Sequence, residues 1–458
     1  MIANPRDVNL KFVEGNECRI LVCPSGFKES LKSHEAADSI EAGIHRVLPN
    51  AYVAKAPLVD GGEGFTEGLI AATGGRLITC KVTGPVGAPI SSHFGFLGGD
   101  GSKTAVIEMA AAAGLSLVPR DMRNPLHTTT YGVGELIKLA LDAGAEKILF
   151  GCGDSGTCDG GVGMAQALGA KFIDRDGHEL PRAVGGLGLL NLSSVDVSGL
   201  DARMRDVTID VACNWHNILC GPKGVARVFG PQKGATPLEV EQLELSMQNV
   251  AAVVGPIVGI DVGSTPGGGA SGGLGAGLLL IGATLHPRFD IVTQFLNIDD
   301  LLADSDLVIT AEGGIDYQTP YGKVPSYIAA RAQVYNVPVI ALAGTVGKGA
   351  VDNYKHGIDA FASIMQSPMP LEKAIADAKR LLTDAAEMTM RMVMVGWNVC
   401  RSVSPGGEPR SRSNSRASAS GRRRSSAVQH SPLSLPASAA PTTTHLAVPE
   451  TSVTSVSS

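Results

Sequence analysis

The sequence alternates short apolar runs with longer segments in which apolar residues recur every three or four positions. Short apolar runs are typical of buried strands, and the longer spacing is typical of amphipathic helices. Strands are predicted at residues 19–23, 53–58, 104–109, 147–150, 207–212, 306–310, 337–343 and 360–364. Helices are predicted at residues 33–47, 133–143, 239–254, 272–285, 325–335, 351–356 and 371–395. Ser33 is the expected N-cap of the first helix, because a serine hydroxyl accepts hydrogen bonds from the free N–H groups there.

The alternation of strands and helices predicts an α/β fold, in which helices cover both faces of a mainly parallel sheet. In such folds ligands bind at the loops beyond the carboxyl ends of the strands. Glycine-rich segments that start at Asp60, Gly151 and Glu312 follow three of the predicted strands. The chemistry of the protein is therefore expected at these loops.

Residues 402–458 have a different composition, in which Ser, Arg, Pro, Ala and Thr dominate and apolar periodicity is lost. Such a segment cannot bury enough apolar surface to offset the entropy of folding. We therefore expect a disordered tail, whose serines and arginines suit phosphorylation or the binding of acidic partners. The simpler interpretation is a solvated segment without a role in catalysis.

The charge is divided unevenly between these two parts. The chain carries a formal charge of −6, and the seven arginines and two glutamates from Arg401 onward contribute +5, so the first 400 residues carry −11. An acidic body is a poor partner for nucleic acid. An anionic substrate would need lysines, backbone N–H groups or a metal ion to balance its charge.

The cysteines and the apolar stretches bear on where the protein works. The eight cysteines form no C-x-x-C pair, so we interpret them as reduced thiols of an intracellular protein. The N-terminus shows no signal-peptide pattern, and the longest apolar stretch, residues 274–285, is too short to span a bilayer. The prediction is a cytoplasmic protein that does not bind membranes.

Two segments, residues 151–156 and 267–272, match the G-x-G-x-x-G pattern of dinucleotide-binding folds. The first continues into residues 157–161, another glycine-rich turn, which delays the helix that a dinucleotide site needs. Residues 153–156 also resemble the nucleophile loop of trypsin-type proteases, but those proteases are all-β proteins. A hydride-transfer enzyme and a serine hydrolase are thus weaker alternatives, and the P-loop pattern G-x-x-x-x-G-K-[ST] is absent.

Three loops combine glycine with acidic and hydroxyl side chains, at residues 60–64, 155–161 and 312–316. Glycine lets the backbone approach a ligand and point N–H groups at phosphate oxygens. Carboxylates hold Mg²⁺ or accept the proton of an attacking hydroxyl. One such loop is usually only a tight turn, but three at strand ends favour phosphoryl transfer. Positive charge to balance phosphate would come from Lys28, Lys233 and Lys323.

Longer motifs carry a specific resemblance. The matching stretches are FKESL at 27–31, PLVDGGEG at 57–64, VTGPVG at 82–87, AVIEMAAAAGL at 105–115, TTYGVGELI at 129–137, CDGGVGMAQALGA at 158–170, GPKGVARVFGPQKGA at 221–235, PGGGASGGLGAG at 266–277 and GKVP at 322–325. Through them the chain resembles the type 1 glycerate kinase family over nearly all of residues 18–400. Their number, order and length make the match much stronger than any single motif.

The resemblance implies an ATP-dependent kinase, a phosphotransferase with an alcohol group as acceptor, which uses Mg²⁺ and transfers the γ-phosphoryl group to D-glycerate. It favours 2-phosphoglycerate as the product and leaves 3-phosphoglycerate open. It also implies a discontinuous flavodoxin-like α/β domain at residues 18–80 and 290–400, an inserted α/β domain at residues 81–289, and the tail at residues 402–458. The expected partners are the small molecules ATP and D-glycerate, and a homodimer is left open.

Candidate site residues come from these loops and motifs. Asp159 is the expected general base for the glycerate hydroxyl, although a cap on the helix that starts near Gly161 would explain it equally well. The other expected catalytic residues are Lys28 and Asp60, and the expected metal ligands are Glu312 and Asp316. The expected substrate and phosphate contacts are Glu63, Thr129, Ser155, Thr157, Gly160, Gly161, Gly268, Gly269 and Lys323. Glu108 is expected either to contact substrate or metal or to be a buried, hydrogen-bonded acid.

Three positions depart from the family pattern. Ser25 and Asn214 stand where the family has aspartates, and Gly314 stands where it has an arginine. Asp154 could replace the carboxylate lost at Ser25, which would make the chain a divergent member of the family with a Ser/Arg-rich tail. The alternative is a catalytically impaired member that acts as a metabolite-binding or scaffold protein.

Overall fold

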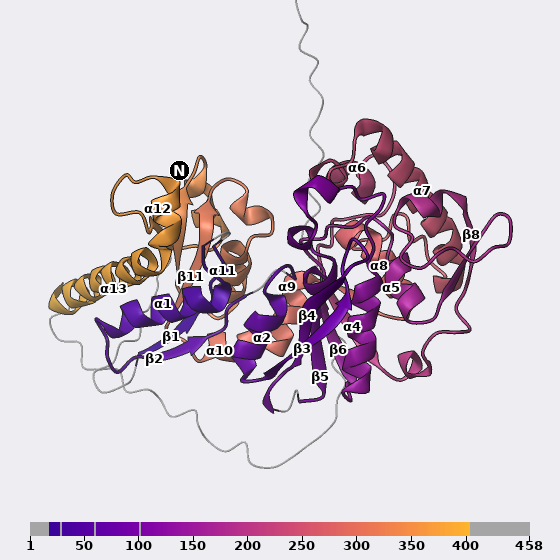
Figure 1. Cartoon of the computed structure of the whole chain (residues 1–458). Helices are drawn as coiled ribbons and strands as arrows, with labels where there is room; N and C mark the ends of the chain where they lie inside the picture. Colours follow the sequence, from indigo (N-terminus) through magenta and orange to yellow (C-terminus); the bar gives the residue numbers. More distant parts are fainter. Residues whose placement is uncertain (1–17, 28–29, 59–60, 100–101, 404–458) are drawn as a thin grey trace, which may run out of the picture. The chain divides into compact units, whose positions relative to one another are not determined.

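The computed structural model describes residues 18–27, 30–58, 61–99 and 102–403. The predictions for Lys28, for Asp60 and for nearly all of the tail lie outside the described residues. The chain forms two units, Met1–Pro405 and Gly406–Ser458, and the fold below belongs to the first (Figure 1). None of the helices in the described residues has the length and apolar character needed to cross a membrane.

A five-stranded sheet, in which all neighbours are parallel, has the strand order β13-β12-β11-β1-β2. Its strands are β1 (Arg19–Val22), β2 (Tyr52–Lys55), β11 (Leu307–Ile315), β12 (Val339–Val346) and β13 (Ala360–Ser363). Ile20 of β1 pairs with Leu307 of β11, so segments almost 290 residues apart in sequence meet in the middle of the sheet. The apolar pattern predicts all five strands, and it is strongest in the central strands β12, β11 and β1, which are largely buried.

Helices cover both faces of this sheet. They are α1 (Ser33–His45), α10 (Ile298–Ala303), α11 (Val324–Val334), α12 (Leu371–Ala376), α13 (Ala378–Val403) and the 3₁₀ helices η7 (Thr319–Tyr321) and η8 (Ala350–His356). In Figure 1, α1 and α13 lie side by side, and a Cβ atom at Gly43 would collide with the Thr383 carbonyl oxygen. The single helix predicted at residues 371–395 is in fact α12 and α13. The predicted N-cap Ser33 is also wrong, because Lys32 holds that position.

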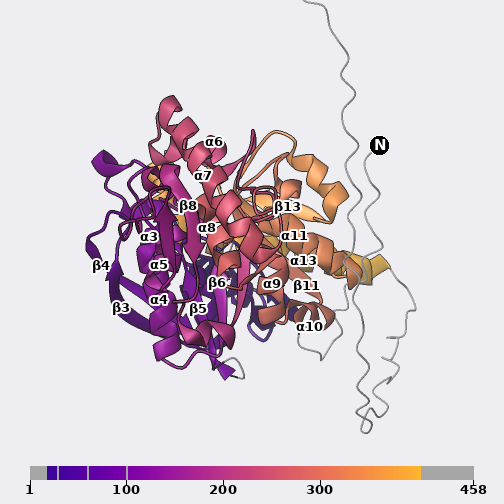
Figure 2. The same ribbon diagram turned by 90° about the vertical axis from the view of Figure 1, so that its right-hand side faces the viewer.

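A six-stranded sheet has the order β10-β9-β6-β5-β4-β3. Its strands are β3 (Arg76–Thr83), β4 (Pro89–Phe96), β5 (Thr104–Glu108), β6 (Lys147–Gly151), β9 (Thr208–Cys213) and β10 (Thr284–Pro287). The four from β10 to β5 are parallel, whereas β4 runs antiparallel to β5 and β3 runs antiparallel to β4. Figure 2 shows β4 and β3 on the side of β5 that faces away from β6. The apolar pattern does not predict β3 and β4, since nearly all residues of β3 and half of those of β4 are exposed or partly exposed. It also does not predict the separate hairpin of β7 (Lys171–Asp174) and β8 (Leu192–Asp196).

Eight α-helices and five 3₁₀ helices of the described residues lie around the six-stranded sheet. They are α2 (Phe65–Thr73), α3 (Ala110–Ala113), α4 (Tyr131–Asp142), α5 (Val162–Ala167), α6 (Val225–Phe229), α7 (Pro237–Val258), α8 (Ala270–Leu280) and α9 (Arg288–Phe295), with the 3₁₀ helices η2 (Leu115–Leu117), η3 (Arg120–Met122), η4 (Leu187–Asn191), η5 (Ala202–Arg205) and η6 (Pro231–Lys233). At the start of α7, Thr236 and Glu239 form a capping box. The helix predicted at residues 272–285 is wrong in its last part, because α8 ends at Leu280 and residues 284–287 form β10.

The two sheets use different parts of the chain. Strands of the five-stranded sheet lie before residue 56 and after residue 306, and those of the six-stranded sheet lie between residues 76 and 287. One core cluster nevertheless joins them, since it contains Leu21 of β1, Phe65 of α2 and Val106 of β5. The domain boundaries given above stay a prediction.

Candidate active site

The loop after β2 lies directly on the loop after β6. A Cβ atom at Gly153 would come within 2.5 Å of the Gly62 Cα atom, so the glycines allow backbone to touch backbone here. The Glu63 N–H group also donates a hydrogen bond to Asp154 Oδ2 over 3.0 Å. The glycine-rich segments that follow β2 and β6 are thus brought together, although the two strands belong to different sheets.

Two carboxylates at this contact are exposed, those of Glu63 and Asp154. Asp154 has a φ of +48°, a left-handed conformation that is unfavourable for residues other than glycine. Such backbone strain is often kept at functional sites. The exposure of both side chains places them where a substrate can reach them, which supports the site prediction for Glu63 and adds Asp154 to the candidate site.

Glu108, the last residue of β5, caps the N-terminus of α2. Its Oε1 accepts from the Gly64 N–H over 3.2 Å, and its Oε2 accepts from the Thr66 N–H over 2.7 Å. The side chain is 2% exposed, and desolvation raises its pKa to about 7 although both hydrogen bonds act to lower it. Glu108 is therefore a buried, hydrogen-bonded acid, and it holds the loop at residues 61–64 in place.

The raised pKa of Glu108 predicts a pH-dependent difference in stability between the protein and a Glu108→Gln variant. In the folded protein the carboxyl group keeps its proton up to about pH 7, whereas in the unfolded chain it keeps the proton only up to about pH 4.5. Its contribution to the free energy of unfolding therefore falls as the pH rises from 4.5 to 7. The free energy of unfolding of the wild type minus that of the variant is expected to fall by about 3 kcal/mol across it. Urea unfolding at several pH values measures this difference, with the exposed Glu372→Gln as control. A difference that stays constant with pH would contradict the prediction.

Asp159 lies inside the protein. Its carboxylate accepts from the N–H and hydroxyl groups of Thr130 and from the N–H groups of Gly161 and Gly163. The residue is 1% exposed, and desolvation raises its pKa while the same hydrogen bonds lower it in part. A general base must come within hydrogen-bond distance of the substrate proton. This geometry therefore supports the capping interpretation of Asp159 and speaks against the base.

The predicted phosphate contact Thr129 belongs to the same buried arrangement. Its Oγ1 accepts from the Tyr131 N–H over 3.2 Å, and the residue is buried. Beside it, the Thr128 hydroxyl donates to the Gly156 carbonyl oxygen over 2.9 Å. These bonds fasten the start of α4 to the loop at residues 155–161, so capping and loop support explain them.

Ser155 and Thr157 accept hydrogen bonds from the ammonium group of Lys233. The Lys233 Nζ donates to Ser155 Oγ over 2.8 Å and to the Thr157 carbonyl oxygen over 2.7 Å. Desolvation lowers the pKa of Lys233 to about 8. The Thr157 Oγ1 is buried and has no hydrogen-bond partner among the described residues. Lys233 thus joins the candidate site through the loop that contains both predicted contacts.

The predicted phosphate-binding glycines face protein. A Cβ atom at Gly161 would come within 2.9 Å of the Gly277 Cα atom, and one at Gly269 would collide with the Ile218 carbonyl oxygen. Tight packing is also found at Gly160 and Gly268. Close approach between chain segments explains why these positions are glycine, and a ligand at any of them stays a prediction.

The segment at residues 312–316 is mainly strand, because β11 continues through Glu312 and Gly314, which pair with β12. The strand end predicted at residue 310 is therefore wrong. The Lys323 Nζ lies 3.9 Å from Glu312 Oε1 and 3.5 Å from Asp316 Oδ1, and it donates to the Gly314 carbonyl oxygen over 2.9 Å. Two predicted metal ligands and one predicted phosphate contact thus form one charged group at the end of β11.

Glu312 and Asp316 fit a Mg²⁺ ion that is shared with a nucleotide. Both are partly exposed carboxylates, and Mg²⁺ is usually bound by one or two carboxylates together with phosphate oxygens and water. Among the described residues, three side chains of His, Cys, Asp or Glu lie close enough to share a metal ion only at Asp174, Asp176 and His178, a mostly exposed group. Glu312 and Asp316 would therefore hold the ion only with oxygens from the substrate and from water.

Each of the three departures from the family pattern has a local partner. The Ser25 hydroxyl donates to the Ala311 carbonyl oxygen over 3.1 Å. Asn214 Oδ1 accepts from the His216 N–H over 3.2 Å. The Gly314 carbonyl oxygen accepts from Lys323, as described above. Ser25 therefore lies beside β11, next to the charged group that contains the predicted metal ligands.

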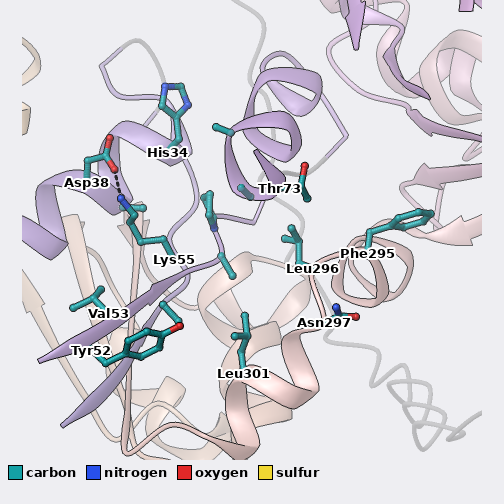
Figure 3. A pocket seen from close by; sticks show the side chains of 16 residues that line it. His34, Asp38, Tyr52, Val53, Lys55, Thr73, Phe295, Leu296, Asn297 and Leu301 are labelled. Atoms are coloured by element: carbon teal, nitrogen blue, oxygen red, sulfur yellow. Dashed lines mark hydrogen bonds and ion pairs between the residues drawn. The ribbon is translucent and has the colours of Figure 1, made fainter. Parts of the chain in front are cut away.

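A pocket of about 630 Å³ lies along the free edge of β2, between α1, α2 and the turn from α9 to α10 (Figure 3). Figure 3 shows Lys55 turned toward Asp38, to which it donates a hydrogen bond over 2.8 Å. None of the predicted site residues that the structure describes lines this pocket. It is therefore separate from the candidate active site.

Comparisons with known proteins match the chain along most of its length. The model of the glycerate kinase family matches residues 20–394. Glycerate kinase of Bacillus subtilis (strain 168) is 48% identical over 369 residues, which cover 80% of this chain and 96% of the relative. Glycerate 2-kinase of Escherichia coli (strain K12) is 45% identical over 361 residues, which cover 79% of this chain and 94% of the relative.

A solved structure has the same fold. The crystal structure described as glycerate kinase 2 from Salmonella typhimurium LT2 aligns with a TM-score of 0.74 and 43% sequence identity, over 84% of this chain and 100% of that chain. The matched range of residues 20–394 includes both sheets, except for Arg19 at the start of β1, and all the candidate site residues described above. The resemblance seen in the motifs is thereby confirmed. The chain belongs to the glycerate kinase family.

Proposed function

We propose that the protein transfers the γ-phosphoryl group of ATP to D-glycerate and that the product is 2-phosphoglycerate. The observation that carries the proposal is the match to glycerate kinases through both sheets and every loop of the candidate site. The relative named glycerate 2-kinase supports transfer to the 2-hydroxyl group. Closely packed glycine loops, exposed carboxylates and two lysines are also the groups that phosphoryl transfer uses.

Positioning and charge balance would supply most of the rate. Glu312 and Asp316 would hold Mg²⁺ together with phosphate oxygens, and a bound Mg²⁺ ion neutralises charge on the phosphates. Lys323 contacts both carboxylates and so limits their mutual repulsion before the nucleotide arrives. Glu63 would contact the substrate from the loop that follows β2.

We assign to Asp154 the acceptance of the proton from the glycerate hydroxyl group. It is exposed, it directly precedes Ser155, and the Glu63 N–H group fixes its Oδ2. Asp159 is less suitable, because it is buried and its oxygens already accept four hydrogen bonds. We therefore move the base role predicted for Asp159 to Asp154.

Purified full-length protein incubated with ATP, Mg²⁺ and D-glycerate is expected to form 2-phosphoglycerate, which phosphorus NMR distinguishes from the 3-isomer. L-glycerate serves as the control acceptor, and the Asp154→Asn variant should turn over more slowly than the wild type. Formation of 3-phosphoglycerate would correct the position of transfer only. No turnover of glycerate, with turnover of another hydroxy acid, would refute the substrate.

Binding of ATP or D-glycerate without turnover would favour the second candidate, a catalytically impaired family member that binds metabolites. The altered positions Ser25, Asn214 and Gly314 motivate this alternative. The cytoplasmic location, the homodimer and the disordered tail stay predictions.

A further inference from the structure

Lys233 brings a positive charge into the interior. It is the last residue of η6, it is 3% exposed, and within the described part of the chain its ammonium group has neutral hydrogen-bond acceptors, Ser155 Oγ and the Thr157 carbonyl oxygen. A buried charge without an opposite charge in contact is unfavourable. Chains that keep such a group often use it at a functional site.

The hydroxyl group of Ser155 has one donor and two acceptor positions. Lys233 occupies an acceptor position, and no described residue accepts the Ser155 hydroxyl proton. Ser155 is 9% exposed, whereas Thr157 is fully buried, and the neighbouring Asp154 is exposed. The Ser155 hydroxyl therefore stands at the point where this loop passes from the surface into the interior.

A charged donor on the hydroxyl oxygen makes the hydroxyl proton a better donor in turn, because hydrogen bonds in a chain polarise one another. We propose that Lys233 is a positioning residue that donates to Ser155 Oγ and thereby directs the Ser155 hydroxyl proton at an anionic oxygen of the bound substrate. Ser155 then contacts the substrate, and Lys233 acts through Ser155. This inference rests on the proposed function, in which that oxygen belongs to a phosphoryl or carboxylate group.

The ionisable groups that face Lys233 are Cys158 and Asp159. Burial raises the pKa of the Cys158 thiol to about 11, so the thiol is neutral where Lys233 titrates. Asp159 accepts four hydrogen bonds, from Thr130, Gly161 and Gly163, and burial raises its pKa although these bonds act to lower it. Lys233 is the group at this place whose pKa lies near 8.

The test is a double-mutant cycle of Lys233→Met and Ser155→Ala. Each single variant is expected to lower kcat/KM about 10- to 30-fold, and the double variant no further, because both remove the same directed hydroxyl group. Thermal unfolding should show that Lys233→Met stays folded, since it removes a buried charge. The exposed Lys223→Met, in the same segment, is the matched control and should keep the wild-type kcat/KM.

A pH profile provides a readout that a purely structural tether would not give. Because burial lowers the pKa of Lys233, its charge is present below about pH 8 and lost above it. The kcat/KM of the wild type should therefore fall above about pH 8, and Ser155→Ala should lack this step. This comparison leaves Lys233 in place, so it also decides the matter if Lys233→Met fails to fold.

Losses that multiply in the double variant, or the same pH step in Ser155→Ala as in the wild type, would overturn the inference. Calorimetric titration of the wild type, the two single variants and the double variant with Mg·ATP and with D-glycerate separates a failure of the positioning role from a failure of the proposed function. If the wild type binds these ligands but does not turn them over, the proposed kinase activity is refuted. The positioning role is still supported if Lys233→Met and Ser155→Ala each weaken binding and the double variant weakens it no further. Binding that is equal in all four proteins, without turnover, would refute it.

Discussion

Replacement of Glu312 by glutamine or of Asp316 by asparagine is expected to lower kcat about 100-fold, which corresponds to about 2.7 kcal/mol of transition-state stabilisation. The Lys323 ammonium group contacts both carboxylates. The two negative charges and the one positive charge together give the group a charge of −1. Either substitution brings this charge to zero. The group then loses its attraction for a divalent cation, while the volume of the side chain is unchanged.

Titration of the activity with Mg²⁺ distinguishes a metal ligand from a residue that only supports the fold. In each variant the Mg²⁺ concentration for half-maximal activity should rise, and the temperature of unfolding without metal should stay close to that of the wild type. Asp300→Asn, an exposed acid on α10, is the matched control. An unchanged Mg²⁺ requirement in both variants would remove the two residues from the metal site.

Replacement of Asp159 by alanine is expected to lower the free energy of unfolding by about 3–5 kcal/mol. The substitution leaves the N–H groups of Gly161 and Gly163 and both donors of Thr130 without their acceptor inside the protein. These donors hold the start of α4 and the start of α5 together. The variant should therefore lose activity because the loop at residues 155–161 is no longer ordered.

Urea unfolding followed by circular dichroism measures this effect, and Asp121→Ala, an exposed acid in η3, serves as control. Asp159→Asn should lie between alanine and the wild type, since its amide oxygen can still accept some of the four hydrogen bonds. If Asp159→Asn has wild-type stability but a much lower kcat, the base role of Asp159 is restored, and the assignment to Asp154 fails.

The central parallel strands could be predicted because burial on both faces gives an apolar run in the sequence, as in β1 and β12. The strands β3 and β4 could not, since a partly exposed edge pair has no such run. The boundary between α8 and β10 was misplaced for another reason. Gly282, with a φ of +89°, turns the chain inside an apolar stretch. The residues before it form α8 and those after it form β10, but both sides are apolar and look alike in sequence.

The candidate site was predicted more reliably as a set of loops than as individual residues. The glycines at residues 61–64 and 151–154 signal a close approach of backbone, but β2 and β6 lie in different sheets, so the sequence does not show that these two segments meet. Whether an acid such as Asp159 faces a substrate or the interior depends on which N–H groups surround it. That depends on tertiary contacts, such as the one with Thr130, which no local pattern encodes. Lys233 posed the same difficulty, because nothing in its sequence neighbourhood marks it as buried.

The contact of Gly153 with Gly62 limits how relatives of this protein can be recombined. A chimera that takes its middle segment from one parent and both ends from another would combine two loops that were never selected to fit each other. A methyl group added at Gly153 would meet the Gly62 backbone, and one added at Gly61 would meet the Cys152 backbone; backbone cannot rotate away as a side chain can. Exchanges between family members should therefore take residues 61–64 and 151–154 from the same parent, and changes in substrate choice are better sought in the exposed side chains of Glu63 and Asp154.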